Sequence, residues 1–327
     1  GVTPLAPNVG LIQWVKQCDL MKGLIIEFRK IGPNYNTYGN SDANTNNNNN
    51  EANNNANNNN NVGGAADNGN MGLNDEKKNF VIDPVNKELS MMKFMTTCNV
   101  DKLMPIHRLE CIKNIMKETS ANDLRDMMWL KAQDAESWIR HTFNFSKTSA
   151  VMSIVGYIIG LGDRHPANIM IQRSTGRVIH IDFGDYFEVS KERKYLAEKI
   201  PFRLTRMMIA TFGPCGIEGS FRATCEATVQ TIREHREAVM SILEIFIREP
   251  CSSGDFFYNS SKIENKMEII SGSVGIIKGS TKSHDKLLKN MSTISKKIDG
   301  LDFDNEIPLS VSEQVDNLIS SATDAYN

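Results

Sequence analysis

The chain has 327 residues, enough for a sizeable core and about two domains, and its 40% hydrophobic and 23% charged residues are ordinary for a globular protein. The formal net charge of −2 gives no overall electrostatic reason to expect a nucleic acid or an anionic membrane as partner. The six cysteines form no C-x-x-C pair and have no histidine at zinc-site spacing, so we expect free thiols in a reducing compartment.

The N-terminal part is predicted to contain a short amphipathic helix and then an asparagine-rich insertion. The helix is placed within residues 11–28, where apolar side chains recur at helical spacing: Leu20, Leu24, Ile25 and Phe28. From 44 to 61, fourteen of eighteen residues are asparagine, a composition that cannot bury enough apolar surface to offset chain entropy. We therefore expect a disordered insertion over residues 32–79, either a tolerated surface loop or an assembly-prone tract.

Ordered structure is predicted to resume near Phe80 with three helices. The first two cover residues 87–95 and 106–116, and Ser120 to Asp123 is typical of the start of the third. Methionines are frequent here and either fill gaps in the core or form a partner-binding surface: Met91, Met92, Met95, Met104 and Met116.

A buried helix and a β-hairpin are predicted in the centre of the chain. Residues 149–161 are apolar nearly all round, which indicates a helix that is buried on every side. Two short apolar runs, 169–171 and 178–181, flank a Ser-Thr-Gly turn and therefore favour a hairpin.

The C-terminal part is predicted to be helical. One helix is expected over residues 224–249, before a proline, and residues 251–285 are rich in Ser, Gly and Lys and are expected to be mobile. A further helix over 287–300 ends at a glycine, a common C-terminal cap, and a short last helix surrounds Leu318. The whole chain is therefore predicted to have an α+β fold, mostly α-helical with a small β-hairpin.

Two polar motifs lie on either side of the predicted hairpin. The loop before it reads DRHPAN at residues 163–168, and the turn after it reads DFG at residues 182–184. Phosphoryl transfer needs a carboxylate to orient the attacking hydroxyl, with a second carboxylate and an amide oxygen to hold Mg²⁺ against the nucleotide phosphates. The protein-kinase signature H-R-D-x-x-x-x-N followed by D-F-G supplies such a set, and the Asp-to-Asn spacing here is the same.

Several side chains near these motifs also have a structural interpretation. Arg164 is expected to pair with a carboxylate, and His165 could be a hydrogen-bonded loop histidine. His180 lies just before Asp182, on the same side of the predicted strand, and is expected either to make an organising hydrogen bond or to pack in the core. The other histidines are expected at the surface or in packing contacts: His107, His141, His235 and His284.

With both motifs in place, the sequence resembles the phosphatidylinositol 3-kinase-related protein kinases, and among them the target of rapamycin (TOR) branch. The stretches that carry the resemblance are AVMSIVGYIIGLGDRHPANIM, GRVIHIDFGDYFEV and EKIPFRLTRMM. It covers most of the chain outside the asparagine-rich and serine-rich segments, and it implies the hinge and C-lobe of a PI3K-type kinase fold.

The resemblance implies roles for the polar motif residues. Asp163 would be the catalytic base that orients the hydroxyl, and His165 would stabilise charge on the transferred phosphoryl group. Asn168 and Asp182 would be the ligands of Mg²⁺ (or Mn²⁺), with ATP as the nucleotide.

The resemblance also implies an adenine site. Trp14 and Val15, in GLIQWV, match the hinge, where the tryptophan would pack on adenine and the valine backbone would hydrogen-bond it. Met170 and Ile181 would form the apolar floor of this site. Without the resemblance, Trp14 would be interpreted as a core or boundary residue and the other two as hairpin core.

Gly184 to about Arg206 corresponds to the activation loop of these kinases. Basic residues there either receive an anionic lipid headgroup, as in phosphoinositide 3-kinases, or form a solvated charged run. A histidine usually follows D-F-G in the lipid kinases, whereas Asp185 follows it here, and the downstream PFRLT is also in the protein-kinase style. The charged residues of interest in the loop are Asp185, Lys191, Arg193, Lys194 and Arg203.

The resemblance therefore implies a serine/threonine protein kinase that transfers the γ-phosphate of ATP to proteins in growth and nutrient signalling. Two other classes stay open. A phosphoinositide 3-kinase-type lipid kinase is disfavoured by Asp185, and a non-catalytic scaffold is disfavoured by the complete set of base and metal positions.

The same resemblance implies an organisation in five parts. They are the hinge and first C-lobe helix (1–31), the asparagine-rich insertion (32–79), the C-lobe core with its catalytic and activation loops (80–250), a flexible segment (251–285), and C-terminal helices that include the start of a FATC segment (286–327). Nothing before Trp14 matches an N-lobe with a glycine-rich loop and phosphate-binding lysine, so we expect a fragment that does not turn over ATP alone.

The expected partners are protein substrates, an LST8-type β-propeller subunit docked on residues 87–116, and further subunits of TOR complexes, but no nucleic acid. No apolar run approaches the roughly 18 residues that span a bilayer, and no signal-peptide pattern is present, so no direct membrane insertion is expected. We expect a cytoplasmic location, with peripheral association with endomembranes only through partners.

Overall fold

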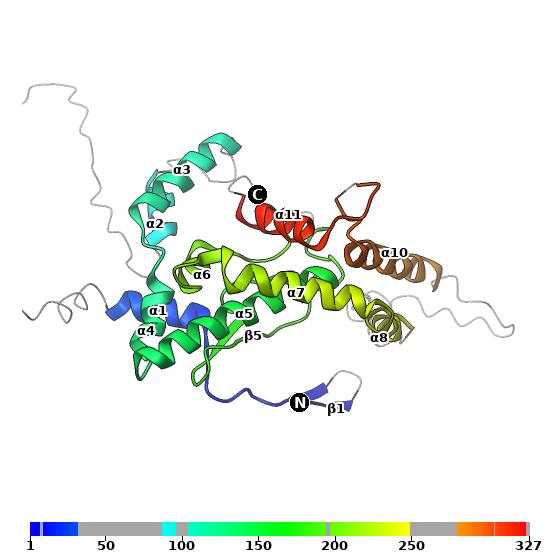
Figure 1. Cartoon of the computed structure of the whole chain (residues 1–327), viewed down its shortest axis with the longest axis horizontal. Coiled ribbons are helices and arrows are strands. Elements are labelled where there is room, and N and C mark those ends of the chain that lie inside the picture. The colour runs from blue at the N-terminus through cyan, green and yellow to red at the C-terminus, as the bar shows by residue number, and fades with distance from the viewer. Residues whose placement is uncertain are drawn as a thin grey trace, which may run out of the picture.

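The computed structural model describes residues 1–6, 9–31, 87–95, 104–193, 197–248, 280–303 and 305–324. The predicted asparagine-rich insertion and most of the segment 251–285 lie outside these residues, so those two predictions are not addressed by the structure. The described part is mainly helical, with two small antiparallel sheets (Figure 1), and this confirms the predicted α+β class. No helix in this part is both long enough and apolar enough to cross a membrane.

Helix α5 (Ala135–Ile159) runs through the middle of the helical body (Figure 1). Its N-cap is Asp134, whose side chain accepts a hydrogen bond from the backbone N of Ser137 at 2.6 Å, and its C-cap is Gly160 with a left-handed φ of 63°. The predicted start near residue 149 was wrong. The first half of α5 contains polar residues on its buried side, among them Ser137, His141 and Thr142, so it lacks the all-round apolar pattern by which the second half was found.

The core lies between α5 and helix α7 (Ser220–Glu234), which packs along it. Three phenylalanines join the two helices: the ring centroids of Phe145 and Phe212 are 5.8 Å apart, and those of Phe212 and Phe221 are 4.7 Å apart. Phe145 and Phe221 are fully buried, and such ring pairs add roughly 0.5–1.5 kcal/mol to the stabilisation from burial alone. These contacts hold the middle of α5, whose C-terminal end leads into the loop before β4.

The single helix predicted over residues 224–249 is two helices, α7 and α8 (Arg236–Arg248). The break is at His235, whose φ of −106° and ψ of 27° leave the helical region. Beyond it, Arg236 pairs with Asp299 of helix α10 (Ser280–Asp299) at 2.9 Å. Apolar spacing in the sequence continues across the break, so periodicity alone could not locate it.

The predicted C-terminal helices are present as α10 and α11 (Val311–Thr323). Gly300, with φ 72°, closes α10 as expected, and Ser310 and Glu313 form a capping box at the start of α11. Helix α10 begins at Ser280, several residues before the start that was predicted at residue 287. The residues before 287 are polar and show no apolar residues at helical spacing. Once the packed part of a helix has formed, the helix can be extended without such apolar residues.

The predicted hairpin is confirmed as β4 (Ile169–Gln172) and β5 (Val178–His180). A third strand, β3 (Cys18–Leu20), pairs with β4 so that Leu20 lies opposite Met170. The residues immediately before α1 (Met21–Ile31) are thus extended, and the helix predicted within residues 11–28 starts only at Met21. Pairing with a strand distant in sequence decides this boundary, and local spacing does not reveal it.

The hairpin turn is held against α5. His141 Nε2 lies 3.0 Å from the carbonyl oxygen of Ser174, and Asn144 Nδ2 donates to that of Thr175 at 2.8 Å. Gly176 has φ 72°, and a Cβ there would come within 2.6 Å of the His141 backbone, so glycine is required at this position. His141 is therefore a packing residue, as expected. Figure 1 shows β5 beside α5. Because β4 and β5 are antiparallel, with Ile169 opposite His180, the loop before β4 and the turn after β5 lie at the same end of the hairpin.

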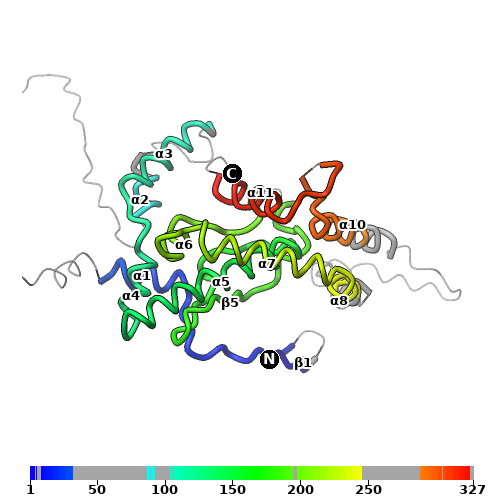
Figure 2. The backbone as a smooth tube through the Cα atoms, in the orientation of Figure 1, coloured from blue at the N-terminus to red at the C-terminus, as the bar shows by residue number. Residues whose placement is uncertain are grey.

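The N-terminal strands β1 (Val2–Ala6) and β2 (Val9–Ile12) form a separate two-stranded sheet. Figure 2 shows this sheet at the edge of the molecule, joined to the helical body through residues 13–20. Its apolar side chains are exposed, with Leu11 at 60% and Ile12 at 79%.

Helices α2 (Lys87–Met95), α3 (Pro105–Glu118) and α4 (Asp123–Lys131) confirm the three predicted helices. Arg29 of α1 anchors two of them, since its guanidinium lies 2.6 Å from both Glu88 of α2 and Asp123 of α4.

Met104 and Met116 are exposed and Met91 and Met92 are half-buried, so a purely core role for the methionines was wrong for the exposed pair. The remaining short elements, which had not been predicted, are helix α6 (Arg206–Thr211) and a 3₁₀ turn (Gly216–Glu218).

Candidate active site

The first motif forms a loop that leaves α5 and enters β4. Asp163 adopts a left-handed backbone conformation with φ 55°, and its backbone N donates to both carboxylate oxygens of Glu198 at 3.1 and 3.2 Å. His165 Nε2 lies 3.9 Å from Asp163 Oδ2. The side chains of Asp163 and His165 are 41% and 50% exposed, so the two predicted catalytic groups lie side by side and open to solvent.

The first turn of α1 also holds this loop. The backbone N of Lys22 donates to the carbonyl oxygen of Pro166 at 3.0 Å. The backbone N of Ala167 donates to Nδ1 of His165 at 3.2 Å, which orients the imidazole with Nε2 toward Asp163. The loop conformation is therefore fixed from both sides while its functional atoms remain accessible.

Asn168 and Asp182, the two predicted metal ligands, are brought together through the backbone. The amide N of Ile181 donates to the carbonyl oxygen of Asn168 at 3.1 Å, which ties the turn at Asp182 to the end of the loop. Asn168 is buried and its Nδ2 donates to the carbonyl oxygen of Asp163 at 2.9 Å, so its Oδ1 faces away from that bond. Asp182 has φ 58°, its Oδ1 accepts from the backbone N of Gly184 at 3.3 Å, and its side chain is exposed.

The side chains of Asn168 and Asp182 offer oxygen donors of the kind that suit a magnesium ion. Mg²⁺ prefers oxygen ligands and is usually held by one or two carboxylates together with phosphates and water. The Asn168 amide oxygen and the second Asp182 carboxylate oxygen are oxygen donors of this type. Among the residues that the structure describes, no group of three or more His, Cys, Asp and Glu side chains could hold a metal, so a pure protein cage is absent there.

Arg164 connects the two motif loops. Its Nε donates to the carbonyl oxygen of Gly162 at 2.7 Å, Nη1 donates to that of Ile181 at 2.8 Å, and Nη2 donates to that of Asp182. The predicted partner, a carboxylate, was wrong, because Arg164 is buried and its guanidinium donates to loop carbonyl groups instead. Its structural role is confirmed: one side chain closes the catalytic loop onto the DFG turn.

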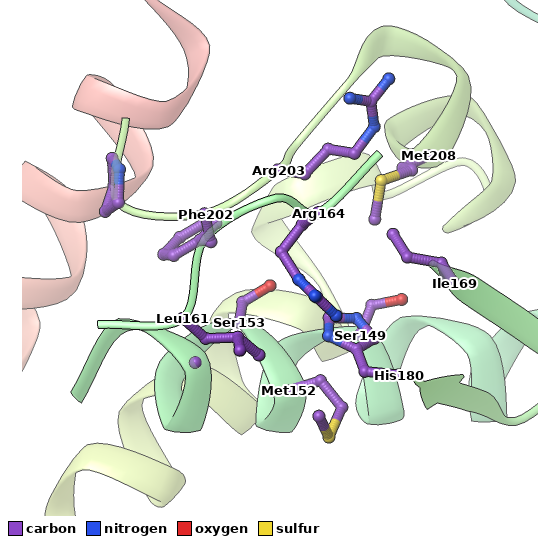
Figure 3. A pocket seen from close by; sticks show the side chains of 12 residues that line it. Ser149, Met152, Ser153, Leu161, Arg164, Ile169, His180, Phe202, Arg203 and Met208 are labelled. Carbon is purple, nitrogen blue, oxygen red and sulfur yellow. The ribbon is translucent and has the colours of Figure 1, made fainter. Parts of the chain in front are cut away.

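Behind Arg164 lies a small cavity of about 20 Å³ between α5, the loop and the segment around Phe202. Figure 3 shows Arg164 directed toward Ser149 and His180 in this cavity, whereas the guanidinium of Arg203 points away from them. His180 Nδ1 and Ser149 Oγ have no hydrogen-bond partner in the described part of the chain. Burial, together with the charge of Arg164, lowers the pKa of His180 to about 4, so this imidazole is neutral near pH 7.

Of the two interpretations of His180, the structure supports packing in the core. Its expected orientation on the same side as Asp182 was wrong. The strand ends at His180, and the positive φ of Asp182 breaks the alternation of an extended chain, so one side chain lines the cavity and the other is exposed.

The four predicted adenine-site residues lie in two places. Trp14 is 75% and Val15 36% exposed, in the segment between β2 and β3. Met170 is 3% exposed and lies on the sheet face opposite that of Ile169 and Ile171, which belong to the helical core. Ile181 follows β5 and is half-buried. Met170 therefore lies on the sheet face that does not join the helical core, and its side chain is covered there.

Several charged residues of the activation loop, called the activation segment below, form ion pairs with one another. Arg193 pairs with Asp185, and Lys191 pairs with Glu188 at 2.8 Å. Arg203 is half-buried, and its Nε has no hydrogen-bond partner in the part of the chain that the structure describes. Burial lowers its pKa. Lys194 lies outside the described residues.

Two contributors to the site were missed by sequence reasoning. Glu198 receives the backbone N of Asp163, and Lys297 of α10 pairs with Glu188 of the activation segment at 2.6 Å. Both lie far along the chain from their partners. Glu198 is the first residue of the EKIPFRLTRMM stretch, but no role was predicted for it, and Lys297 belongs to no recognisable motif. The one available signal for Lys297 was a charged residue next to the apolar Ile294 and Ile298 of a predicted helix.

The chain is similar to known proteins over most of its length. The sequence profile of the family described as phosphatidylinositol 3- and 4-kinase matches residues 1–253. The chain is 32% identical to serine/threonine-protein kinase tor1 of Schizosaccharomyces pombe over 350 residues, and 36% identical to serine/threonine-protein kinase TOR of Arabidopsis thaliana over 249 residues. These alignments cover 100% and 76% of the chain but 13% and 8% of those relatives, so the chain spans about a tenth of their length.

Solved structures give the same result for the fold. The FAT and kinase domain of CtTel1 aligns with a TM-score of 0.54 and 25% identity, covering 74% of the chain and 15% of that structure. A Tel1 kinase described as a butterfly symmetric dimer aligns with a TM-score of 0.51 and 28% identity, covering 73% of the chain and 10% of that structure.

Proposed function

We propose, on the premise that this chain belongs to the phosphatidylinositol 3- and 4-kinase family, that it forms part of the catalytic region of a serine/threonine protein kinase. The reaction would transfer the γ-phosphate of ATP to a protein hydroxyl. The observation that supports this most directly is the joining of two loops. Arg164 and the bond from Ile181 N to the Asn168 carbonyl oxygen hold Asp163, Asn168 and Asp182 at one end of the hairpin.

Each of these residues has a chemical task in the proposed reaction. The exposed Asp163 carboxylate would orient the attacking hydroxyl and accept its proton, and His165 beside it would stabilise negative charge on the phosphoryl oxygens. Asn168 and Asp182 would hold Mg²⁺, which when bound neutralises phosphate charge. Trp14, Val15, Met170 and Ile181 would position the adenine.

A protein substrate is supported over a lipid by the activation segment. Its basic residues Lys191 and Arg193 are paired with Glu188 and Asp185, which leaves less positive charge for an anionic headgroup. The TOR relatives are named as serine/threonine-protein kinases.

A competition assay on the full-length protein tests the substrate class. Labelled Mg-ATP is offered together with a Ser/Thr peptide and phosphatidylinositol vesicles. We expect label in the peptide at a rate at least tenfold above that in lipid. Label mainly in lipid would overturn the protein-kinase proposal, and bound ATP without transfer to either substrate would indicate a scaffold.

We further propose that the exposed face of α2 and α3, within residues 87–116, docks a β-propeller subunit of the LST8 type. Large apolar side chains are exposed there, among them Met104 at 64%, Ile106 at 57% and Met116 at 46%. Arg29 anchors α2 to the rest of the fold, so this face is held in a fixed orientation. Assembly into larger complexes, binding of protein substrates and peripheral contact with endomembranes would then depend on such partners.

The substitution Ile106→Asp is expected to weaken propeller binding at least tenfold, because it places a charge in an apolar contact. The matched control is Ile242→Asp, an equally exposed isoleucine at 58% on α8. Co-purification of the full-length variants with the propeller subunit measures the effect. Equal loss in both variants, or none in Ile106→Asp, would contradict the proposed docking face.

A further inference from the structure

A buried lysine links the C-terminal helix α10 to the activation segment. Lys297 is 3% exposed; its Nζ donates to the carbonyl oxygen of Tyr157 at 2.7 Å and lies 2.6 Å from Glu188 Oε1. The same ammonium lies 4.6 Å from the centre of the Tyr157 ring. Burying a lysine has a large desolvation cost, which an apolar residue at this position of α10 would avoid. Its contacts therefore require an explanation beyond packing.

The partner of Lys297 lies in a constrained stretch of backbone. Phe187 and Glu188 both have positive φ values, 55° and 62°, which are unfavourable for residues with a side chain. The backbone N of Phe187 donates to the carbonyl oxygen of Ile159 at 2.9 Å, and that of Glu188 donates to Gly160 at 3.0 Å. Two unfavourable residues in succession persist only if surrounding contacts hold them, and Lys297 supplies a charged one.

This stretch lies directly against the start of the catalytic loop. A Cβ at Gly160 would come within 2.6 Å of the Glu188 backbone N, so the two segments are in close contact. Further along, the backbone N of Gly162 donates to the carbonyl oxygen of Asp185 at 2.8 Å. Asp163 is the next residue. The position of residues 185–188 therefore sets the path by which the chain enters the catalytic loop.

Lys297 and Glu188 are both charged near neutral pH, as an ion pair requires. Burial lowers the pKa of Lys297 to about 8, while Glu188 acts in the opposite direction, so the ammonium is largely charged near pH 7. Burial acts to raise the pKa of Glu188, but Lys297 and Lys191 outweigh it and lower the value, so the carboxylate is ionised. The pair is therefore a true ion pair at neutral pH.

We propose that Lys297 is a positioning residue, which acts from α10 through Glu188 to hold the activation segment against the end of α5 and so orders the entry to the catalytic loop. The effect of Lys297 on catalysis rests on the proposed kinase function. The contact between Lys297 and Glu188 does not depend on that function.

The test uses the full-length protein with Lys297→Met, which keeps the length of the side chain and removes its charge. The matched control is Lys296→Met, on the exposed face of the same helix. Two quantities are measured: hydrogen exchange of the backbone amides of Phe187, Glu188 and Gly162, and the kcat and KM of peptide phosphorylation. We expect at least tenfold faster exchange at these amides and at least tenfold lower kcat, with KM for ATP changed less than threefold, in Lys297→Met only.

A double variant separates positioning from general packing. If Lys297 acts through Glu188, then Glu188→Gln combined with Lys297→Met should lower kcat no more than the stronger single variant does. Unchanged exchange at these amides in Lys297→Met, or a rise equally large throughout α5 and α7, would overturn the proposal. If the wild-type protein transfers no phosphate, the kinase proposal fails, and the exchange pattern still decides whether Lys297 holds the segment.

Discussion

Replacing Asp163 with Asn in the full-length protein is expected to lower kcat for peptide phosphorylation by roughly 10²–10⁴-fold, the contribution of a positioned general base. The fold around it should survive. The contacts of residue 163 that shape the loop are made by its backbone, whose N donates to Glu198 and whose carbonyl oxygen accepts from Asn168. Asparagine also tolerates the left-handed φ of 55° well, so the substitution removes the carboxylate charge and little else.

The dependence of the rate on magnesium distinguishes the roles of the two acidic residues. Asp163→Asn should leave the Mg²⁺ concentration for half-maximal rate unchanged, because this carboxylate is not a proposed ligand. The companion variant Asp182→Asn, at another positive φ, should raise that concentration, because it removes a proposed ligand charge. Steady-state rates over a magnesium series measure both. A normal kcat in Asp163→Asn, or the same magnesium shift in both variants, would refute the assignment.

The structural features that the sequence predicted correctly depend on patterns among residues that are close together in the chain. The β4–β5 hairpin depends on two apolar runs and a turn whose Gly176 must adopt a positive φ, and all of this lies within a few residues. The two motif loops flank that hairpin, so their proximity followed once the hairpin was predicted. The helix start at Asp123 and the cap at Gly300 were equally local.

The features that were not predicted depend on contacts between distant residues. Strand β3 is extended because it pairs with β4, far along the chain, and the first half of α5 buries polar side chains such as His141 and Thr142. The partners of Arg164 are carbonyl groups, which every residue carries, so no side-chain pattern could identify them. Lys297 and Glu198 act across similar separations. Sequence motifs thus located the candidate chemistry but not the contacts that hold it in place.

The second large effect is expected from Arg164→Met. Methionine fills similar space, but it leaves the carbonyl groups of Gly162, Ile181 and Asp182 without the donors that now join them. A buried polar group left without its partner costs about 1–3 kcal/mol, so we expect a loss of about 3 kcal/mol or more in the stability of this region. Because the same bonds connect the catalytic loop to the DFG turn, kcat should fall at least tenfold even at temperatures where the variant remains folded.

The comparison with Arg173→Met makes this prediction specific. Arg173 also makes a two-point contact, with the Asp19 carboxylate, but its side chain is 62% exposed, and surface pairs of this kind contribute little. Arg164→Lys should lie between the wild type and Arg164→Met, since one ammonium can replace only part of a three-point contact. Thermal unfolding and kcat of the full-length variants measure both effects. If Arg164→Met and Arg173→Met behave alike, the guanidinium does not close the site, and the hairpin alone must hold the two loops together.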